Sequence, residues 1–243
     1  MMKSLNTPEI ILKSKSIGHP IDFNWTRKKI QQFLDPLEEN KELENILIEI
    51  NHKATVGLAA ALLEWINCRF SGYSKASTDI QQRIEALWCS IANPENTTPL
   101  IFDPNLDIPA SGSVNGPIWV ALMNIRMIDI RYRKGSYFIQ NEILGLVLLA
   151  RYITPKKKFF DKWFNDTVIE LKRLYPCTYN YNSLDETDEA IYDSSNEPAI
   201  CRDFFFDPAF EFTHENSENG LMDFIANLDS KSNPFLQLSQ KAS

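Results

Sequence analysis

Ala54-Thr-Val-Gly-Leu-Ala-Ala-Ala-Leu-Leu-Glu-Trp-Ile-Asn-Cys-Arg-Phe70 is the stretch of sequence that decides the fold class. Drawn as a helix, it is apolar on nearly every side, which is typical of a helix surrounded by other helices. Its alanines and Gly57 allow neighbouring backbones to approach closely, and Ser71-Gly72 predicts its end. We therefore expect this segment to form the centre of an all-α fold.

Helical spacing of apolar residues recurs on both sides of this stretch. Asn24 suits the N-cap of a first helix that Pro36 interrupts, and Thr78 with Gln81 has capping-box spacing before another. A Pro at a first-turn position is tolerated because its missing N–H has no helical partner there. The pattern predicts helices, besides 54–70, over residues 24–35, 36–50, 78–92, 117–134, 137–153 and 154–175.

These observations predict an irregular bundle of about seven helices with an acidic, mostly non-helical C-terminal extension. We expect three parts: a loose N-terminal arm over residues 1–19, a helical domain over 20–176, and a phenylalanine-rich extension over 177–243 that packs on the helical domain. The 8 glycines in 243 residues are too few for the many tight turns of a β-sandwich or barrel.

The charge of the chain is concentrated in one segment. The formal net charge is −7, yet residues 185–223 hold twelve Asp or Glu and one basic residue, Arg202. Residues 1–184 hold 22 basic and 19 acidic residues, so the rest of the chain is faintly basic. A negative balance disfavours general binding to nucleic acid or to an acidic membrane surface.

The cysteines and the N-terminus indicate a cytoplasmic protein. The four cysteines are scattered without a C-x-x-C pair, a usage that fits reduced thiols: Cys68, Cys89, Cys177 and Cys201. The first six residues lack the apolar core of a secretory signal. The apolar runs 54–63 and 143–150 are shorter than the ~20 residues of a membrane span, so we expect no membrane contact.

No motif for catalysis, cofactor binding or metal binding is present. The sequence lacks G-x-S-x-G, H-E-x-x-H, the phosphate-binding G-x-x-x-x-G-K-[ST] and the dinucleotide fingerprint G-x-G-x-x-G. His19, His52 and His214 are far from one another and from any cysteine at ligand spacing. We therefore predict no catalytic residues, no cofactor and no metal, and expect that the protein is not an enzyme.

Several charges lie in apolar helical segments and leave one alternative open. Glu64, Arg126 and Glu142 are among them, and burying a charge is costly unless it is paired. Ion pairs between helices are the simpler interpretation. The alternative is an enzyme with a polar pocket in which burial raises the pKa of Glu64 and Glu142.

The acidic segment is the most informative part of the sequence for function. Five phenylalanines follow one another closely, and we predict that they lie mostly buried on the helical body: Phe204, Phe205, Phe206, Phe210 and Phe212. The carboxylates between and before them would then face outward. We predict that the partner-binding residues are Asp185, Glu186, Asp188, Glu189, Asp193, Asp203, Asp207, Glu211, Glu215 and Glu218.

Residues 59–70 (Ala-Ala-Ala-Leu-Leu-Glu-Trp-Ile-Asn-Cys-Arg-Phe) and 83–88 (Arg-Ile-Glu-Ala-Leu-Trp) carry a resemblance to a known group. The region from about residue 56 to 91 resembles bacterial α-helical immunity and accessory proteins encoded beside type VI or contact-dependent secretion toxins. The matching residues belong to the core, so no functional residue is carried over. The resemblance implies a non-catalytic role in binding a partner protein.

The leading expectation is an immunity protein that neutralises a cognate bacterial toxin by occluding its active or substrate-binding site. Acidic surfaces suit toxins whose sites are basic. Two alternatives remain: an adaptor or chaperone that delivers an effector to a secretion apparatus, and the helical enzyme around Glu64, Arg126 and Glu142. The sequence alone does not decide the oligomeric state.

Overall fold

The computed structural model describes residues 5–36, 40–105, 107–180 and 191–238, and the regular elements in these ranges are helices. Two isolated β-bridges join segments outside the helices, one between Ile50 and Pro176 and the other between Thr97 and Leu236. The all-α fold class predicted from the sequence is therefore confirmed for the described part of the chain.

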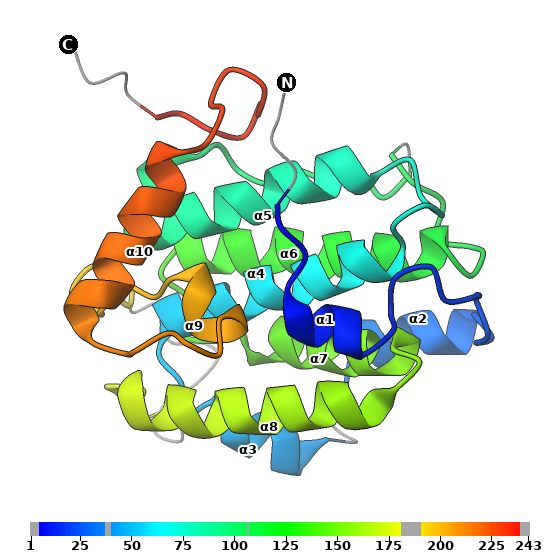
Figure 1. Cartoon of the computed structure of the whole chain (residues 1–243), viewed down its shortest axis with the longest axis horizontal. Coiled ribbons are helices and arrows are strands. Elements are labelled where there is room, and N and C mark those ends of the chain that lie inside the picture. Colours follow the sequence, from blue (N-terminus) through cyan, green and yellow to red (C-terminus); the bar gives the residue numbers. More distant parts are fainter. Residues whose placement is uncertain (1–4, 37–39, 106, 181–190, 239–243) are drawn as a thin grey trace.

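Helix α4 (His52–Arg69) lies at the centre of the molecule (Figure 1). Only Asn67 and Cys68 of its 18 residues are not buried, and it packs against α5, α6, α7 and α9. The Asn51 side chain caps the helix by accepting a hydrogen bond of 2.9 Å from the Ala54 N–H. The segment that the sequence predicts to be surrounded by other helices is therefore surrounded by them in the structure.

The other helices surround α4 and cover it on several sides (Figure 1). Those that precede the acidic segment are α1 (Glu9–Lys13), α2 (Arg27–Leu34), α3 (Lys41–Leu47), α5 (Ser77–Ala92), the 3₁₀ helix η2 (Pro94–Asn96), α6 (Asn115–Arg133), α7 (Gln140–Ile153) and α8 (Lys157–Leu174). Helix α8 is amphipathic: its Phe160, Trp163, Phe164 and Leu171 are buried and its lysines face solvent.

Two helix starts differ from the sequence prediction. The first helix of the predicted set, α2, is capped by Thr26 rather than Asn24, because the Thr26 Oγ1 accepts the Lys29 N–H. Helix α5 begins at Ser77, one residue before Thr78, so no capping box forms and its N-cap residue, Ala76, makes no side-chain cap bond. Cap spacing alone did not locate the first turn in either case.

Residues 5–19, which we expected to belong to a loose arm, instead carry α1 and bury four residues, Pro8 among them. Ile11, Ser14 and Ser16 have 0% exposure. The Ser14 hydroxyl donates a hydrogen bond of 2.6 Å to the Ile11 carbonyl and lies 2.6 Å from the Ser16 hydroxyl. Helix α1 packs on α8 (Figure 1), so this stretch contributes to the surface that the following subsection describes.

The segment after α8 returns to the helical body and adds two helices there. Helix α9 (Arg202–Phe206) packs on α4, and α10 (His214–Ala226) packs on α5 and α9 (Figure 1). The Thr213 hydroxyl caps α10 by accepting the Asn216 N–H at 2.9 Å. We expected this region to be mostly non-helical, and the periodicity of its sequence did not reveal α9 or the start of α10.

Candidate functional site

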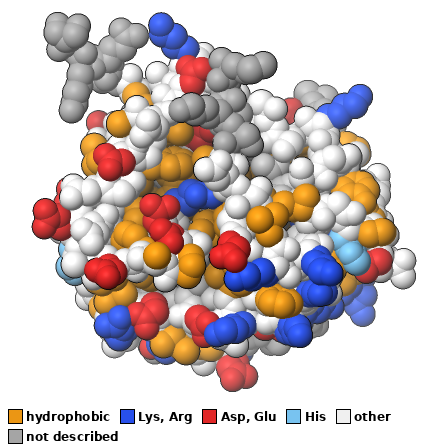
Figure 2. Space-filling view, in the orientation of Figure 1, with side chains coloured by type: hydrophobic (Ala, Val, Ile, Leu, Met, Phe, Trp, Pro, Cys, Tyr) orange, Lys and Arg blue, Asp and Glu red, His pale blue; other side chains and the backbone are white. Residues whose placement is uncertain are grey.

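The ten acidic residues predicted to bind a partner fall into two groups in the structure. Asp185, Glu186, Asp188 and Glu189 lie outside the described residues. The six described ones, Asp193, Asp203, Asp207, Glu211, Glu215 and Glu218, are all exposed. We call the five that lie on α9, on α10 or between them the acidic face: Asp203, Asp207, Glu211, Glu215 and Glu218. Figure 2 shows acidic side chains over this region and basic ones gathered at the opposite side of the same view.

The carboxylates of the acidic face form no ion pair within the described residues. Several exposed acids elsewhere are paired: Asp166 contacts Lys162 at 2.7 Å and Asp161 contacts Arg151 at 2.6 Å. Unpaired charges of one sign on neighbouring elements add to a single field. The acidic face therefore presents five carboxylates without an ion pair in the described residues, and the charges of Lys53 and Arg202 act on Glu218 and Asp203 from nearby.

Arg202 ties the acidic face to the centre of the molecule. Its guanidinium donates two hydrogen bonds to the Glu64 carboxylate on α4, from Nε to Oε2 at 2.9 Å and from Nη2 to Oε1 at 2.5 Å. The Glu64 side chain is 4% exposed and the Arg202 side chain 15%. Burial raises the pKa of Glu64, and the hydrogen bonds and charge of Arg202 lower it again. Arg202 also donates to the Asn6 carbonyl at 2.7 Å, which brings the N-terminal segment to the same point.

The phenylalanines next to Arg202 hold the acidic face by apolar contacts. Phe205 and Phe206 are buried, and Phe204, Phe210 and Phe212 are half-buried. The Phe206 ring stacks on Trp163 of α8 at 6.0 Å with a 7° angle between the planes. The Trp163 Nε1–H donates to the Phe205 carbonyl at 2.8 Å. None of the five rings predicted to be buried is exposed, and two of them, Phe205 and Phe206, are buried.

A groove of about 360 Å³ lies where α1, α8 and residues 204–212 meet. Its walls are largely aromatic and aliphatic, with Ile10 from α1, Trp163 and Leu174 from α8, and Phe204 and Phe210 from the returning segment. In Figure 1 this junction is the place where α8 runs below α1 and α9. We call it the α1–α8 groove. A concave apolar site of this size is within the range of ligand and side-chain pockets.

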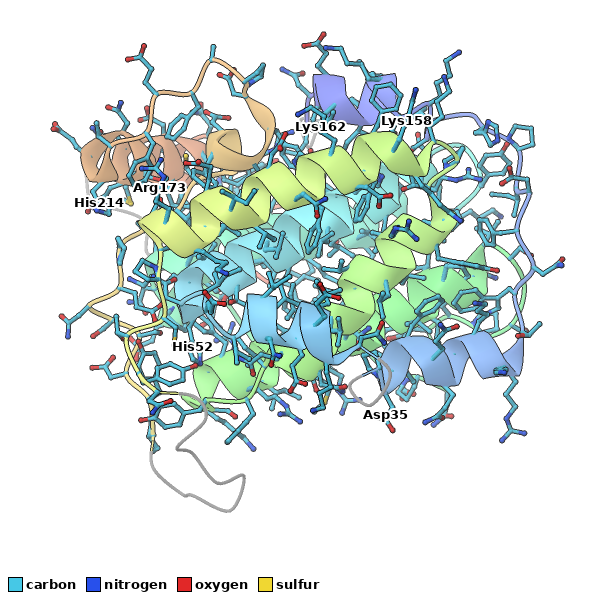
Figure 3. The ribbon with its side chains drawn as sticks, turned by 90° about the horizontal axis from the view of Figure 1, so that it is seen from below. Asp35, His52, Lys158, Lys162, Arg173 and His214 are labelled. Carbon is cyan, nitrogen blue, oxygen red and sulfur yellow. The ribbon has the colours of Figure 1, made fainter. Side chains whose placement is uncertain are left out.

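Charged residues are ordered along the rim of the α1–α8 groove. Lys162, Asp166 and Glu170 follow one another at one-turn intervals on α8, so the basic residue lies nearer the N-terminal end of that helix. Figure 3 shows Lys158 and Lys162 towards that end of α8, and Arg173 towards the other end near His214 of α10. Asp207 of the acidic face also lines the groove, and its carboxylate accepts only the Ala209 N–H at 2.9 Å among the described contacts.

The two basic rim residues are neutralised by neighbours, whereas the acidic end is not. Lys13 contacts Glu9 at 2.8 Å across one turn of α1, and Lys162 contacts Asp166 at 2.7 Å across one turn of α8. Asp207, like the other residues of the acidic face, forms no ion pair with a described residue. The groove is therefore close to neutral at its α1 end and negative at its α9 end.

Glu197 fixes the segment before α9 to the N-terminus of α4. Its carboxylate accepts the backbone N–H groups of His52 at 3.1 Å and Lys53 at 2.7 Å, which places a negative charge at the positive end of the helix dipole. The Tyr192 hydroxyl donates to the same carboxylate at 2.6 Å. Burial lowers the pKa of His52, whose Nε2 lies 2.8 Å from the Ser136 carbonyl. This cluster holds chain segments together.

The three residues of the alternative enzyme site do not come together. Glu64 pairs with Arg202, whereas the Glu142 Oε1 lies 3.3 Å from Arg131 Nε. A cavity of about 90 Å³ borders Glu64, and neither Arg126 nor Glu142 lines it. Burial raises the pKa of both carboxyl groups, which is the shift expected for buried acids in general. The structure supplies no converging pair of acids here.

Within the described ranges, no three His, Cys, Asp or Glu side chains are grouped closely enough to hold a metal ion. None of the described helices combines the length and the apolar character that a membrane crossing requires. Burial raises the pKa of Cys68 and Cys89 to about 12, so neither thiol has the low pKa of a reactive cysteine.

Comparison with known proteins gives no family for this chain. No protein-family model, no curated protein and no solved structure matches it.

Sequence reasoning missed the groove rather than the acidic face. Ile10 and Lys13 fall in the stretch expected to be a loose arm, and Trp163 is an apolar residue of α8 whose spacing indicates only core packing. Trp163 is 7% exposed and the α1–α8 groove reaches it, so it belongs to both the core and the groove wall. Lys162, Asp166 and Glu170 follow one another at four-residue spacing, and this spacing alone predicts a charged stripe along one side of α8. Its position beside the phenylalanines could not be predicted from the sequence.

Proposed function

We propose that this chain is a non-catalytic protein that binds a partner protein with a basic surface through the acidic face. The observation that carries the proposal is that Asp203, Asp207, Glu211, Glu215 and Glu218 are exposed without an ion pair among the described residues. They lie on elements that buried contacts hold to the helical body, so little ordering entropy is lost when a partner binds. A negative field of this kind speeds encounter with a basic partner and disfavours acidic ones.

The partner class that we propose is a bacterial toxin, and the role is that of an immunity protein. The resemblance of residues 56–91 to immunity and accessory proteins supports this choice. An acidic face complements a nuclease or another toxin whose substrate site is basic, and covering that site would block activity. The protein would act in the cytoplasm of the producing cell, where such a toxin must be neutralised.

The test measures association with the product of the gene that neighbours the gene for this chain. We compare the wild-type chain with the double variant Glu215→Lys/Glu218→Lys over a range of salt concentrations. The expected association rate falls by at least about 10-fold at low salt, and the difference fades as the salt concentration rises, because screening removes long-range attraction.

The matched control is Glu42→Lys/Glu95→Lys, which makes the same change in net charge at two exposed acids outside the acidic face. It should associate nearly as fast as the wild type. Equal rates for all three proteins at low salt would refute the role of the acidic face. In a parallel growth assay, co-production of the chain should restore growth of cells that make the toxin; binding without protection would indicate the adaptor role instead.

A further inference from the structure

The shape and lining of the α1–α8 groove suit an inserted aromatic side chain of a partner better than contact with a flat partner surface. The volume of the groove, about 360 Å³, is larger than the volume of a single aromatic side chain. Aromatic residues form much of its lining. Phe206 and Trp163 stack on each other and are each only 7% exposed, whereas Phe204 and Phe212 meet edge-to-face at 6.2 Å and are half-buried. Phe204, Phe210 and Phe212 therefore supply the accessible ring surface of the groove. Aromatic pairs in such offset or edge-to-face arrangements gain stability beyond their buried area.

The charges along the groove determine which charged group of a partner can bind beside that ring. Asp207 has no cationic partner in the described chain, and Glu170 pairs only with the exposed Arg173. Exposed ion pairs contribute little stability, so an incoming cation can compete for Glu170. The residues that line the groove include four carboxylates, those of Glu9, Asp166, Glu170 and Asp207, against two lysines, Lys13 and Lys162. The lining of the groove therefore carries an excess of negative charge and favours a cation over an anion.

We propose that the α1–α8 groove is the anchor pocket for a segment of the partner that presents an aromatic ring beside a Lys or Arg. This inference rests on the proposed protein-binding function and deepens it by naming the contact that makes binding long-lived. The ring fills the space between Ile10, Trp163 and Phe204, and the cation meets Asp207 and Glu170. Buried aromatic and Arg anchors that fill preformed pockets dominate the binding energy of many interfaces.

The experiment uses three small probes on the full chain, observed by ligand-detected NMR. Tryptamine carries an indole ring with an ammonium group, indole-3-propionate carries the same ring with a carboxylate, and indole carries no charge. We expect tryptamine to bind more tightly than indole-3-propionate by about two- to fivefold, the ratio that one exposed charge pair can produce. Indole should fall between them.

Two variants locate the effect. Glu170→Gln/Asp207→Asn should bring the ratio of the tryptamine and indole-3-propionate affinities close to one while indole binding is retained. The matched control Glu215→Gln/Glu218→Gln removes two acids of the same surface that do not line the groove and should keep the wild-type ratio. Ile10→Trp places a ring in the groove and should abolish binding of all three probes; if that variant fails to fold, the charge variants still decide the question.

Equal affinities for tryptamine and indole-3-propionate in the wild type, tighter binding of the propionate, or no binding of any probe would each overturn the inference. These outcomes leave the acidic face untouched, because its test changes Glu215 and Glu218 and reads the association rate. With the partner in hand, Glu170→Gln/Asp207→Asn should chiefly raise the dissociation rate, whereas Glu215→Lys/Glu218→Lys should chiefly lower the association rate.

Discussion

Arg202 and Glu64 form the contact on which the acidic face depends at the scale of single residues. Arg202 is the one basic residue between positions 185 and 223, and Glu64 is the one carboxylate inside the apolar stretch 54–70. In the sequence, Glu64 stood out as a charge in an apolar segment that requires a partner, and Arg202 stood out only as the one basic residue of the acidic segment. That they are each other's partners could not be predicted, because the pairing spans 138 positions and depends on how the returning segment crosses α4.

Arg202→Met should destabilise the protein strongly. The substitution keeps an apolar side chain of similar length but leaves Glu64 buried without a countercharge, and breaking a buried pair in this way costs about 3–5 kcal/mol. Urea denaturation at pH 7 measures the loss in the free energy of unfolding. The matched control is Arg173→Met, which removes an exposed partner of Glu170 and should cost no more than about 1 kcal/mol.

The pH dependence of this variant has a defined sign. Without Arg202, burial raises the pKa of Glu64 further above its value in the unfolded chain, so the folded state holds the proton more tightly. Stability relative to the wild type is then best at low pH and falls as the pH rises through the folded-state pKa. A difference between variant and wild type that stays constant from pH 4 to pH 8 would contradict the assigned role of Arg202.

At the scale of elements, hydrophobic periodicity predicted the long helices well and the short ones poorly. Helices α4, α6, α7 and α8 carry enough apolar positions at helical spacing to be read directly. Helix α10 buries only Ser217, Leu221 and Ile225, so one thin stripe distinguishes it from a loop, and α9 has five residues of which three are phenylalanine. Such short helices form because the body of the protein provides a surface for them, which no local pattern reveals.

Gly145→Ala tests how closely two helices approach at α7. A Cβ at this position would lie 2.2 Å from the carbonyl oxygen of Phe33, at the end of α2, and 2.8 Å from Asn124 Nδ2. Asn124 donates a hydrogen bond to that same carbonyl at 3.2 Å. The added methyl group must therefore push backbone apart, and we expect a loss of about 1–3 kcal/mol although alanine favours a helix more than glycine does.

Denaturation midpoints of Gly145→Ala and of Gly220→Ala provide the comparison. Gly220 is also inside a helix, α10, and a Cβ there would meet Cys201 atoms at 3.2 and 3.3 Å, a milder contact with a side chain. The Gly220 variant should stay within about 1 kcal/mol of the wild type because its gain in helix propensity offsets that contact. Equal stabilities for the two variants would show that the α2–α7 approach is not as tight as described.

At the scale of the whole molecule, acidic side chains lie over the region of α9 and α10 in Figure 2, whereas acidic and basic side chains are mixed along the lower part of the same view. The candidate acids could be chosen from the sequence because charge is visible there without a fold. The α1–α8 groove could not, because its walls come from residues 9–13, 162–174 and 204–212, three stretches that only the tertiary structure joins. The surface that we propose to bind a partner is thus a product of the C-terminal segment packing on the body.

Because the C-terminal segment packs on the body, we expect the two to fold as one cooperative unit. A chain that ends at Pro176 should therefore not fold on its own. Truncation there removes seven buried apolar side chains, namely Ile200, Cys201, Phe205, Phe206, Leu221, Ile225 and Leu236. At about 1.5–3 kcal/mol each, their burial contributes on the order of 10–20 kcal/mol, as much as the entire stability of an ordinary domain. It also uncovers Trp88 and Trp163, which contact Phe205 and Phe206, and leaves Glu64 without Arg202.

Thermal unfolding followed by near-ultraviolet circular dichroism, which reports on packed tryptophans, distinguishes the outcomes. The chain 1–176 should lack the near-ultraviolet signal and a sharp transition, whereas the chain 1–238, which keeps every residue named above, should melt as the full chain does. If residues 1–176 unfold cooperatively with native tryptophan signals, the C-terminal segment is an appendage to an independent helical domain. The segment that carries the acidic face could then dissociate from a body that stays folded, and Arg202→Met should release that segment without unfolding the body.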